Sequence, residues 1–211
     1  MPFARHDAWP YLLAGLAGLT AGTPPATAPP PTAPPMPLPT QAATLKIDGA
    51  RSEARFVVKL RLRLRANGRI PKVSGEMTGD AKAGWRVLVV ADGRSLVVKG
   101  PKWMERSTRS PDFLDVDAHP EIRFHSERFS DAVLHSGGPV HGQLSLRGLT
   151  RAVSFRLLPS ACAHPGRDCD LQVNGTINRK EFGMTAYPVS VRDDVELRMR
   201  VRLLGPAGAS P

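Results

Sequence analysis

The sequence lacks the short motifs that mark the commonest catalytic and metal sites. It contains no HExxH or CxxC pair, no GxSxG elbow and no glycine-rich phosphate loop. Its six histidines form no closely spaced set with carboxylates. These absences argue against a zinc centre, a serine hydrolase and a nucleotide-binding enzyme. We therefore predict a protein that is not an enzyme and that holds no metal or other cofactor.

A hydrophobic run long enough to cross a bilayer is also missing. Apolar residues dominate positions 11–21, a run shorter than the ~20 residues that a spanning helix needs. Because Arg5 supplies positive charge before this run, we predict a secretory signal peptide over residues 1–22. No cysteine lies near the run, which argues against a lipoprotein anchor. An uncleaved N-terminal membrane anchor is the alternative.

Proline is abundant in one segment only. Most residues between 24 and 39 are Pro, Ala or Thr, a composition that favours extended polyproline II and buries little apolar surface. We predict a disordered linker over residues 23–43. The segment 44–204 is long enough for a single domain with a sizeable core, and residues 205–211 form a disordered tail.

The formal net charge is +10, and a basic surface attracts anionic membranes or nucleic acid. No nucleic-acid-binding motif accompanies the charge, and the arginines are scattered over many segments. We therefore predict no nucleic-acid partner and consider an anionic membrane surface as a partner. An arginine-rich genome would produce the same charge with no function attached.

The clearest local pattern is an alternation over residues 54–66. The even positions are apolar: Ala54, Phe56, Val58, Leu60, Leu62, Leu64 and Ala66. The odd positions are mostly Arg or Lys. Since successive side chains of a strand point to opposite faces, this alternation predicts one long strand with an apolar face and a cationic face. The dipeptide Asn67-Gly68 then predicts a turn.

The same alternation recurs along the rest of the chain. It predicts strands within residues 86–90, 95–99, 121–129, 140–147, 153–157, 171–178 and 195–203, and one short helix within 101–113. Strands of this kind belong to an antiparallel sheet with one wet face. The fold class is therefore all-β, as either a sandwich or a closed barrel, and alternation alone cannot choose between the two.

Three segments, in this order and spacing, resemble the YceI-like family of periplasmic polyisoprenoid-binding proteins: SPDFLDVDAHPEIRF (110–124), GQLSLRGLTRAVSF (142–155) and INRKEFG (177–183). The resemblance covers residues 44–204. It implies an antiparallel, lipocalin-like β-barrel of about eight strands with a short helix, enclosing a long apolar channel for an isoprenoid chain.

The resemblance also implies where a lipid would bind. The candidate channel-wall residues are Phe56, Val58, Leu60, Leu62, Leu64, Phe113, Ile122, Phe124, Leu144, Leu146 and Phe155. The same residues would form an ordinary core in a barrel filled by its own side chains. Arg179, in the family's Asn-Arg pair, either reaches a lipid head group at the mouth or ties down a loop by pairing with an acidic residue.

Cys162 and Cys169, the only two cysteines, flank the turn-rich segment AHPGRD between two predicted strands. In an exported protein such a pair forms a disulfide. Zinc binding together with His164 is the alternative.

We therefore predict a periplasmic or secreted barrel that binds a polyisoprenoid or a similar amphiphilic lipid non-covalently, as a carrier or buffer. The alternative from another class is a filled barrel that docks through its cationic surface on anionic envelope or protein surfaces. A hydrolase or isomerase acting on prenyl lipids is a more distant third reading.

Overall fold

The structure is a computed structural model that describes residues 42–61 and 64–205. All of these residues belong to one compact unit, Pro39–Pro211. The predicted signal peptide, the linker up to residue 41, Leu62 and residues 206–211 of the predicted tail lie outside the described residues. The first strand begins at Ala43, the last residue of the predicted linker.

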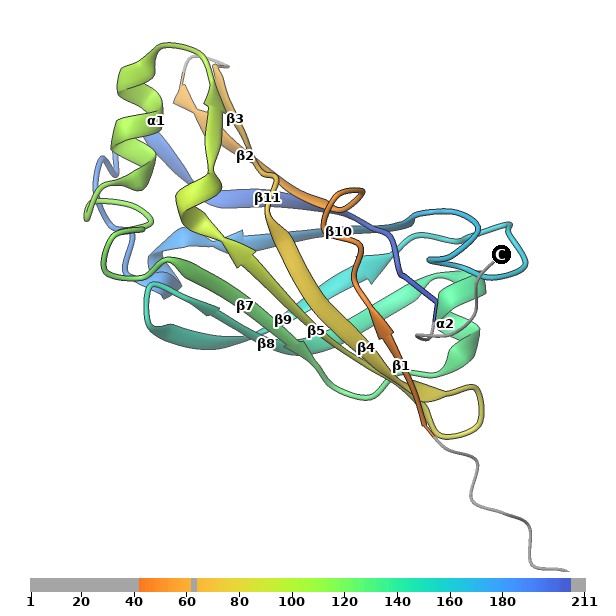
Figure 1. Ribbon diagram of the computed structural model, residues 1–211. Coiled ribbons are helices and arrows are strands. Elements are labelled where there is room, and N and C mark those ends of the chain that lie inside the picture. Colours follow the sequence, from red (N-terminus) through yellow and green to blue (C-terminus); the bar gives the residue numbers. More distant parts are fainter. Residues whose placement is uncertain (1–41, 62–63, 206–211) are drawn as a thin grey trace, which may run out of the picture. The chain divides into compact units, whose positions relative to one another are not determined.

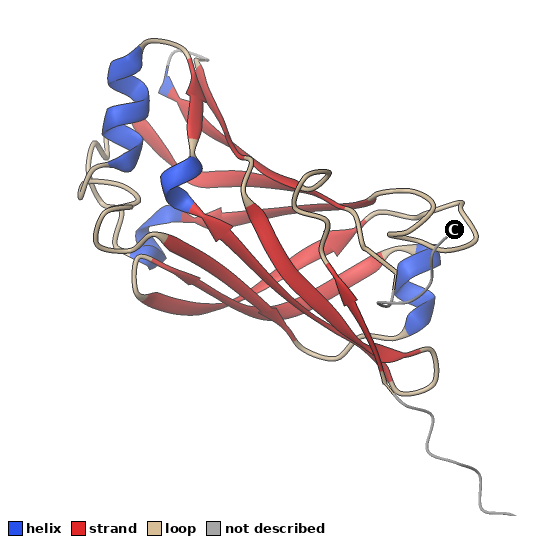
Figure 2. Cartoon of the chain, in the orientation of Figure 1, coloured by secondary structure: helices blue, strands red, loops and turns tan. Residues whose placement is uncertain are grey.

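Within these described residues, eleven antiparallel strands form a single sheet (Figures 1 and 2). They are β1 (Ala43–Lys46), β2 (Glu53–Leu60), β3 (Arg65–Ile70), β4 (Val73–Asp80), β5 (Gly84–Asp92), β6 (Val97–Lys99), β7 (Glu121–Ser126), β8 (Gly138–Leu146), β9 (Leu149–Leu157), β10 (Leu171–Asn178) and β11 (Val191–Val201). Their order in the sheet is β1-β4-β5-β7-β8-β9-β10-β11-β2-β3-β6. The helices are α1 (Lys102–Arg109) and α2 (Asp131–Ser136), with 3₁₀ turns η2 (Gly93–Ser95) and η3 (Arg179–Phe182).

The sheet is curled so that its two edges, β1 and β6, are both connected to the opposite side of the sheet. β3 continues into β4 after two residues, and β5 leads through η2 into β6, which pairs with β3. At the other edge, an isolated bridge joins Ile47, after β1, to Leu203, after β11. The predicted all-β, lipocalin-like fold is confirmed. The strand number exceeds the predicted one because β1 and β4 were not predicted and because the segment predicted as one strand over residues 54–66 contributes to two, β2 and β3.

The long strand predicted over residues 54–66 is a hairpin. β2 ends at Leu60, the backbone N–H of Leu60 donates to the carbonyl of Leu64 at 2.9 Å, and β3 begins at Arg65. The alternation misled because it runs through both strands of the hairpin without marking the reversal. Asn67-Gly68 is therefore no turn and lies inside β3, where Gly68 faces Phe56.

The remaining local predictions agree with the structure. The alternation at 171–178 corresponds to β10, and the helix expected within 101–113 is α1, which begins after Pro101. Gly148 has a φ of +71° in the two-residue turn between β8 and β9, a conformation that glycine adopts at little cost.

The two ends of the barrel differ in what closes them (Figure 1). We call one the α1 end: it comprises α1, the β2–β3 and β8–β9 turns and residues 179–190. The other is the α2 end, which comprises α2, the β4–β5 turn and residues 158–170.

Candidate functional site

The barrel interior contains an apolar cavity of about 120 Å³. Strands from around the sheet contribute to its wall, among them β2, β5, β7, β8, β9, β10 and β11. Among the described residues, the polar ones in the lining are Arg55, Thr108 and Arg179. The side chain of Arg55 is itself 61% exposed and forms an ion pair with Glu53 outside the cavity. Such a site recognises a ligand by excluding water from apolar surface rather than by hydrogen bonds.

The structure brings most of the candidate wall residues together. Those that line the cavity are Phe56, Val58, Phe113, Ile122, Phe124, Leu144, Leu146 and Phe155. Leu60 and Leu64 instead border an outer groove between the β2–β3 hairpin and β11, and Leu64 is 61% exposed. Unlike the other described candidates, these two residues do not line the cavity, because the chain reverses after Leu60. Leu62 lies outside the described residues.

Other lining residues were missed. They are mainly Val89 and Ala91 on β5, Ile177 on β10, and Val195, Leu197 and Met199 on β11. Alternation identifies these residues as the apolar face of their strands. It does not reveal which part of that face borders empty space, because the void depends on how side chains from distant strands pack.

Three phenylalanine rings of the wall lie over glycines of a neighbouring strand. A Cβ added to Gly68 would come within 2.0 Å of the Phe56 ring, and one on Gly175 within 2.1 Å of the Phe155 ring. A Cβ added to Gly142 would come within 2.8 Å of the Phe124 ring. Each glycine lets a ring lie against the sheet, and this arrangement helps to leave the middle of the barrel open.

A second apolar cavity of about 50 Å³ lies toward the α2 end. The two cavities share Val89, Phe124, Phe155 and Met199 in their linings. Phe124 and Phe155 are packed edge to face with ring centroids 4.9 Å apart. This pair therefore belongs to the partition that divides the barrel interior into a larger and a smaller chamber.

Residues of the α1 end cover the larger cavity. Thr108, Phe113, Leu114 and Met184 all line it. The hydroxyl of Thr108 donates to the carbonyl of Met104 at 2.7 Å, so its donor is already used. The outer face of this cover is an aromatic stack, because the ring of Phe113 lies parallel to that of Tyr187 with centroids 5.9 Å apart.

Arg179 is 1% exposed and is held by the chain itself. Its Nη1 donates to the carbonyls of Met184 and Ala186 at 2.5 and 2.7 Å, and its Nη2 and Nε donate to the carbonyls of Val191 and Arg192, both at 3.2 Å. Nη2 also lies 3.4 Å from Oδ1 of Asp193. This geometry agrees with the loop-tying alternative for Arg179, because its donors are already used on residues 184–193.

Asp193 is shared between Arg179 and Lys180, whose Nζ lies 2.8 Å from Oδ2 of Asp193. The hydrogen bond from Lys180, with smaller contributions from the positive charges of Lys180 and Arg179, holds the pKa of Asp193 below its ordinary value. The carboxylate therefore stays charged into mildly acidic conditions and keeps the α1-end loop attached to η3.

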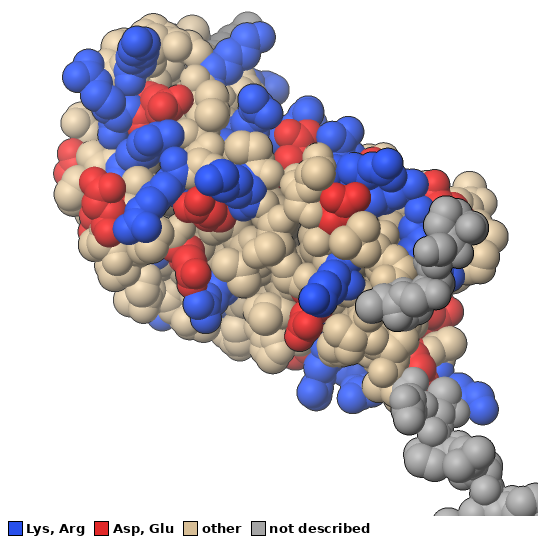
Figure 3. Space-filling view, viewed as in Figure 1, with Lys and Arg blue, Asp and Glu red and all other residues tan. Residues whose placement is uncertain are grey.

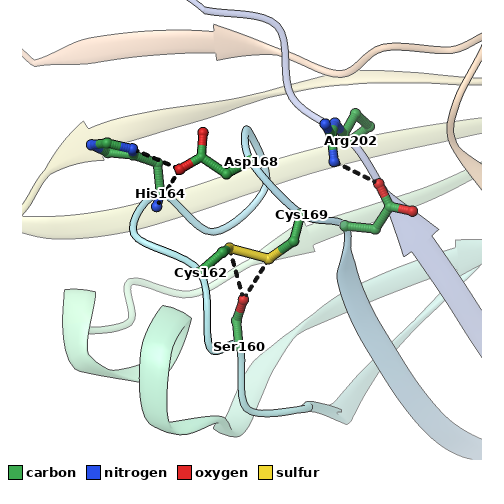
Figure 4. The surroundings of a disulfide bond; sticks show 7 residues. Ser160, Cys162, His164, Asp168, Cys169 and Arg202 are labelled. Carbon is green, nitrogen blue, oxygen red and sulfur yellow. Dashed lines mark hydrogen bonds and ion pairs between the residues drawn. A yellow bond between two sulfur atoms is a disulfide. The ribbon is translucent and has the colours of Figure 1, made fainter.

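Cys162 and Cys169 form the predicted disulfide at the α2 end (Figure 4). The hydroxyl of Ser160 lies 2.8 Å from the sulfur of Cys169, and Nδ1 of His164 lies 2.8 Å from a carboxylate oxygen of Asp168. With both sulfurs in the disulfide, neither is a thiolate, so the alternative of zinc binding with His164 is excluded in this form. A disulfide fits a location outside the cytoplasm.

Among residues 42–61 and 64–205, no three or more His, Cys, Asp or Glu side chains are grouped as a metal ion would require. No helix in this described part of the chain is both long and apolar enough to cross a membrane.

The profile of the YceI-like domain matches residues 45–203. The chain belongs to the YceI family. No curated protein matches the sequence of this YceI-family chain. Among solved structures it is similar to BcnA of Burkholderia cenocepacia, at 20% identity and a TM-score of 0.62 over 75% of this chain and 99% of the other.

A second similar structure is a polyisoprenoid-binding domain from Saccharophagus degradans that is implicated in plant cell wall breakdown. It shares 14% identity and a TM-score of 0.57 with the YceI-family chain, over 77% of this chain and 98% of the other. At these identities both likenesses establish a shared fold.

Proposed function

We propose that this protein binds the prenyl chain of a polyisoprenoid, or of a similar amphiphilic lipid, non-covalently inside the barrel. It is not an enzyme, and it acts in the periplasm as a carrier or buffer. The observation that carries the proposal is the cavity, whose lining is apolar except for Arg55, Thr108 and Arg179. The polyisoprenoid-binding domain of the same fold supports this choice of ligand.

The energetics of such binding follow from apolar burial. Each Å² of apolar surface removed from water contributes about 25 cal/mol, so a long hydrocarbon chain needs no strong polar contact. The two polar groups best placed to hold a head group, on Thr108 and Arg179, already donate to backbone carbonyls. We therefore place the head group outside the cavity, beyond the cover formed by Phe113 and Tyr187.

The size of the cavity sets a condition on uptake. Small-molecule sites commonly have volumes of about 300–1,000 Å³, and the two chambers have about 120 and 50 Å³. A long prenyl chain therefore enters only when lining side chains move apart. Met184 and Met199 in the lining are unbranched and adapt readily, and the Phe124–Phe155 partition is the barrier to the deeper chamber.

The alternative of a filled barrel that docks through its cationic wall receives less support. Several basic side chains of β2 and β11 are paired with carboxylates on the same outer face: Arg55 with Glu53 at 2.5 Å, and Lys59 with Glu196 at 2.6 Å. Figure 3 shows basic and acidic residues interspersed over much of the visible face. Such pairing lowers the attraction of the wall for an anionic surface.

The direct test fills the cavity from its wall. Ala91 is buried on β5 and lines the larger chamber, so Ala91→Leu extends a side chain into the space that the prenyl chain would occupy. We expect this variant to bind a fluorescent prenyl-alcohol probe at least about tenfold more weakly, with a melting temperature close to that of the lipid-free parent. Ala152→Leu, on the exposed face of β9, is the matched control and should bind like the parent.

Strong destabilisation of Ala91→Leu with unchanged binding would show that the interior is an ordinary core. Equal binding by the parent and both variants, with equal stability, would place the ligand elsewhere on the protein. Comparison must use lipid-free protein, because a bound ligand raises the apparent stability by mass action.

A further inference from the structure

Large apolar side chains are exposed at the α1 end far more than at the other end. Trp103 on α1 is 60% exposed, Leu64 after the β2–β3 turn 61%, and Tyr187 and Val189 before β11 53% and 66%. At the α2 end, Leu204 is the exposed large apolar residue among those that the structure describes. The three segments that carry these exposed residues are distant in sequence and lie at the same end of the barrel (Figure 1).

These segments are in contact with one another. The backbone N–H of Arg61 donates to the carbonyl of Ser190 at 2.9 Å, which joins the β2–β3 turn to the loop that carries Tyr187 and Val189. Tyr187 in turn stacks on Phe113, which follows α1. These contacts bring the segments that carry Leu64, Tyr187 and Val189 together beside Phe113, and α1, which carries Trp103, precedes Phe113 in the chain.

Basic side chains surround these exposed apolar residues. Lys102 and Arg106 are exposed on α1 one turn apart, beside Trp103. The groove between the β2–β3 hairpin and β11 is lined by the basic residues Lys59, Arg61, Arg65 and Arg192 and the acidic residues Asp193 and Asp194. Within the described residues, Arg61, Lys102 and Arg106 make no ion pair with a carboxylate. Basic side chains gather over α1 and the neighbouring hairpin in Figure 3.

We propose that the α1 end docks on the surface of an anionic lipid bilayer. Exposed Trp and Tyr side chains are enriched where protein meets the membrane–water interface, and nearby Lys and Arg are attracted to anionic head groups. The combination of apolar anchors with a basic rim matches a lipid surface better than it matches a folded acidic protein, which offers no apolar layer for four protruding side chains. The docking face consists of Leu64, Trp103, Tyr187 and Val189 with Arg61, Lys102 and Arg106.

The docking face lies next to the residues that cover the larger cavity. Tyr187 stacks on Phe113, and Phe113 lines the larger cavity. A bilayer that contacts Tyr187 therefore lies against the stack that helps to cover the larger cavity, so the docking face lies at the end of the barrel by which a lipid chain would enter. Docking itself goes beyond the proposed ligand binding and does not depend on it.

The test is co-sedimentation of the lipid-free full chain with phosphatidylcholine vesicles that contain or lack phosphatidylglycerol. We expect binding to the anionic vesicles that weakens as salt is raised. Lys102→Glu with Arg106→Glu should lower the affinity at least about tenfold. Trp103→Ser with Val189→Ser should lower it to a similar degree without removing the salt dependence, because it removes the apolar anchors alone.

Matched control variants lie at the α2 end. Lys82→Glu, in the β4–β5 turn, and Leu204→Ser are exposed positions of the same residue types, and we expect their affinities to stay within about twofold of the parent. Melting curves confirm that each variant is folded. Two results would overturn the docking face: equal losses of vesicle affinity in the α1-end and α2-end variants, or vesicle binding that no α1-end variant weakens. All variants carry the same N-terminal segment, so vesicle binding by that segment would be equal in all of them. Prenyl-probe binding is measured separately, so failure of one proposal leaves the other standing.

Discussion

The two ends of the barrel are held by different kinds of interaction. The α2 end has a disulfide between Cys162 and Cys169, a hydrogen bond of 2.8 Å from the Trp85 indole to Asp131, and the Ile47–Leu203 bridge. The α1 end has no covalent link among its described residues, and its loops depend on the contacts of Arg179 and on the Phe113–Tyr187 stack.

This difference matches what each end has to do under the proposed function. An end through which a ligand passes must open without global unfolding, so its contacts must be breakable one at a time. The opposite end keeps the sheet curled around the cavity while that happens. Under the proposed function we therefore expect the α2 end to stay fixed while the residues that cover the cavity at the α1 end move, and the variants below test this difference.

The largest expected effect is at Arg179. Arg179→Met removes the donors that reach four backbone carbonyls around residues 184–192, and a buried acceptor left without a partner costs about 1–3 kcal/mol. We expect a loss of about 3 kcal/mol or more in the free energy of unfolding, measured by denaturant titration. Hydrogen exchange should accelerate first in residues 184–191.

Arg202→Met at the α2 end is the matched control. Arg202 makes an ion pair of 3.2 Å with Asp170, and its side chain is partly exposed, so its loss should cost no more than about 1 kcal/mol. Equal costs for the two arginines would contradict the view that Arg179 is the main polar support of the α1 end.

The next effect tests the α2 end. Replacing both cysteines by serine removes a cross-link with a sequence separation of 7, and the chain-entropy relation gives a loss of about 2–3 kcal/mol. Thermal unfolding with and without reductant measures it. Because neither cysteine lines a cavity, we expect prenyl-probe binding to be unchanged once the protein is folded. If probe binding were lost together with stability, the α2 end would also take part in binding, which would contradict the proposed difference between the two ends.

Part of this architecture could be predicted from the sequence, and the rest could not for physical reasons. The alternation at residues 171–178 matched β10 because each side chain there faces either the interior or solvent. β4 escaped prediction because Gly75 and Gly79 interrupt its pattern. At Gly75 a Cβ would come within 2.0 Å of the carbonyl oxygen of Leu88, so close packing of the neighbouring strand excludes the side chain that would have revealed the strand.

The candidate site shows the same limit. Motif residues such as Phe113, Phe124 and Phe155 were identified as wall candidates, and they line the cavity. Leu64, another candidate, lies at an outer groove instead, because the alternation could not show that the chain reverses after Leu60. The partition could not be foreseen at all, since it arises where Phe124 of β7 meets Phe155 of β9 in three dimensions.

The smallest expected effect is a pH dependence that differs between the ends. The pKa of Asp193 at the α1 end is lowered mainly by its hydrogen bond from Lys180, and the pKa of Asp168 at the α2 end mainly by its hydrogen bond with His164. Each carboxyl therefore has a lower pKa when folded than when unfolded. The charged carboxylate therefore stabilises the folded state at a pH above the pKa of the unfolded chain. This stabilisation is lost as the pH falls through the lower pKa of the folded protein.

We therefore expect acid to loosen residues 184–193 before the barrel unfolds, as a rise in hydrogen exchange when the pH falls through the lowered pKa of Asp193. Asp193→Asn should abolish that acid-dependent rise at the α1 end, and Asp168→Asn should change only the loop of residues 162–169. An identical acid response in parent and Asp193→Asn would show that the Asp193 carboxylate does not hold the loop.

The account depends most on the claim that the barrel holds a prenyl chain. Native mass spectrometry of the protein purified gently from its own cell envelope measures this directly. We predict a species that carries one bound lipid, whose extracted mass identifies a polyisoprenoid or a prenylated amphiphile, and whose occupancy falls in Ala91→Leu but not in Ala152→Leu. Protein that is always free of lipid, or that carries only phospholipid in equal amounts in both variants, would contradict it.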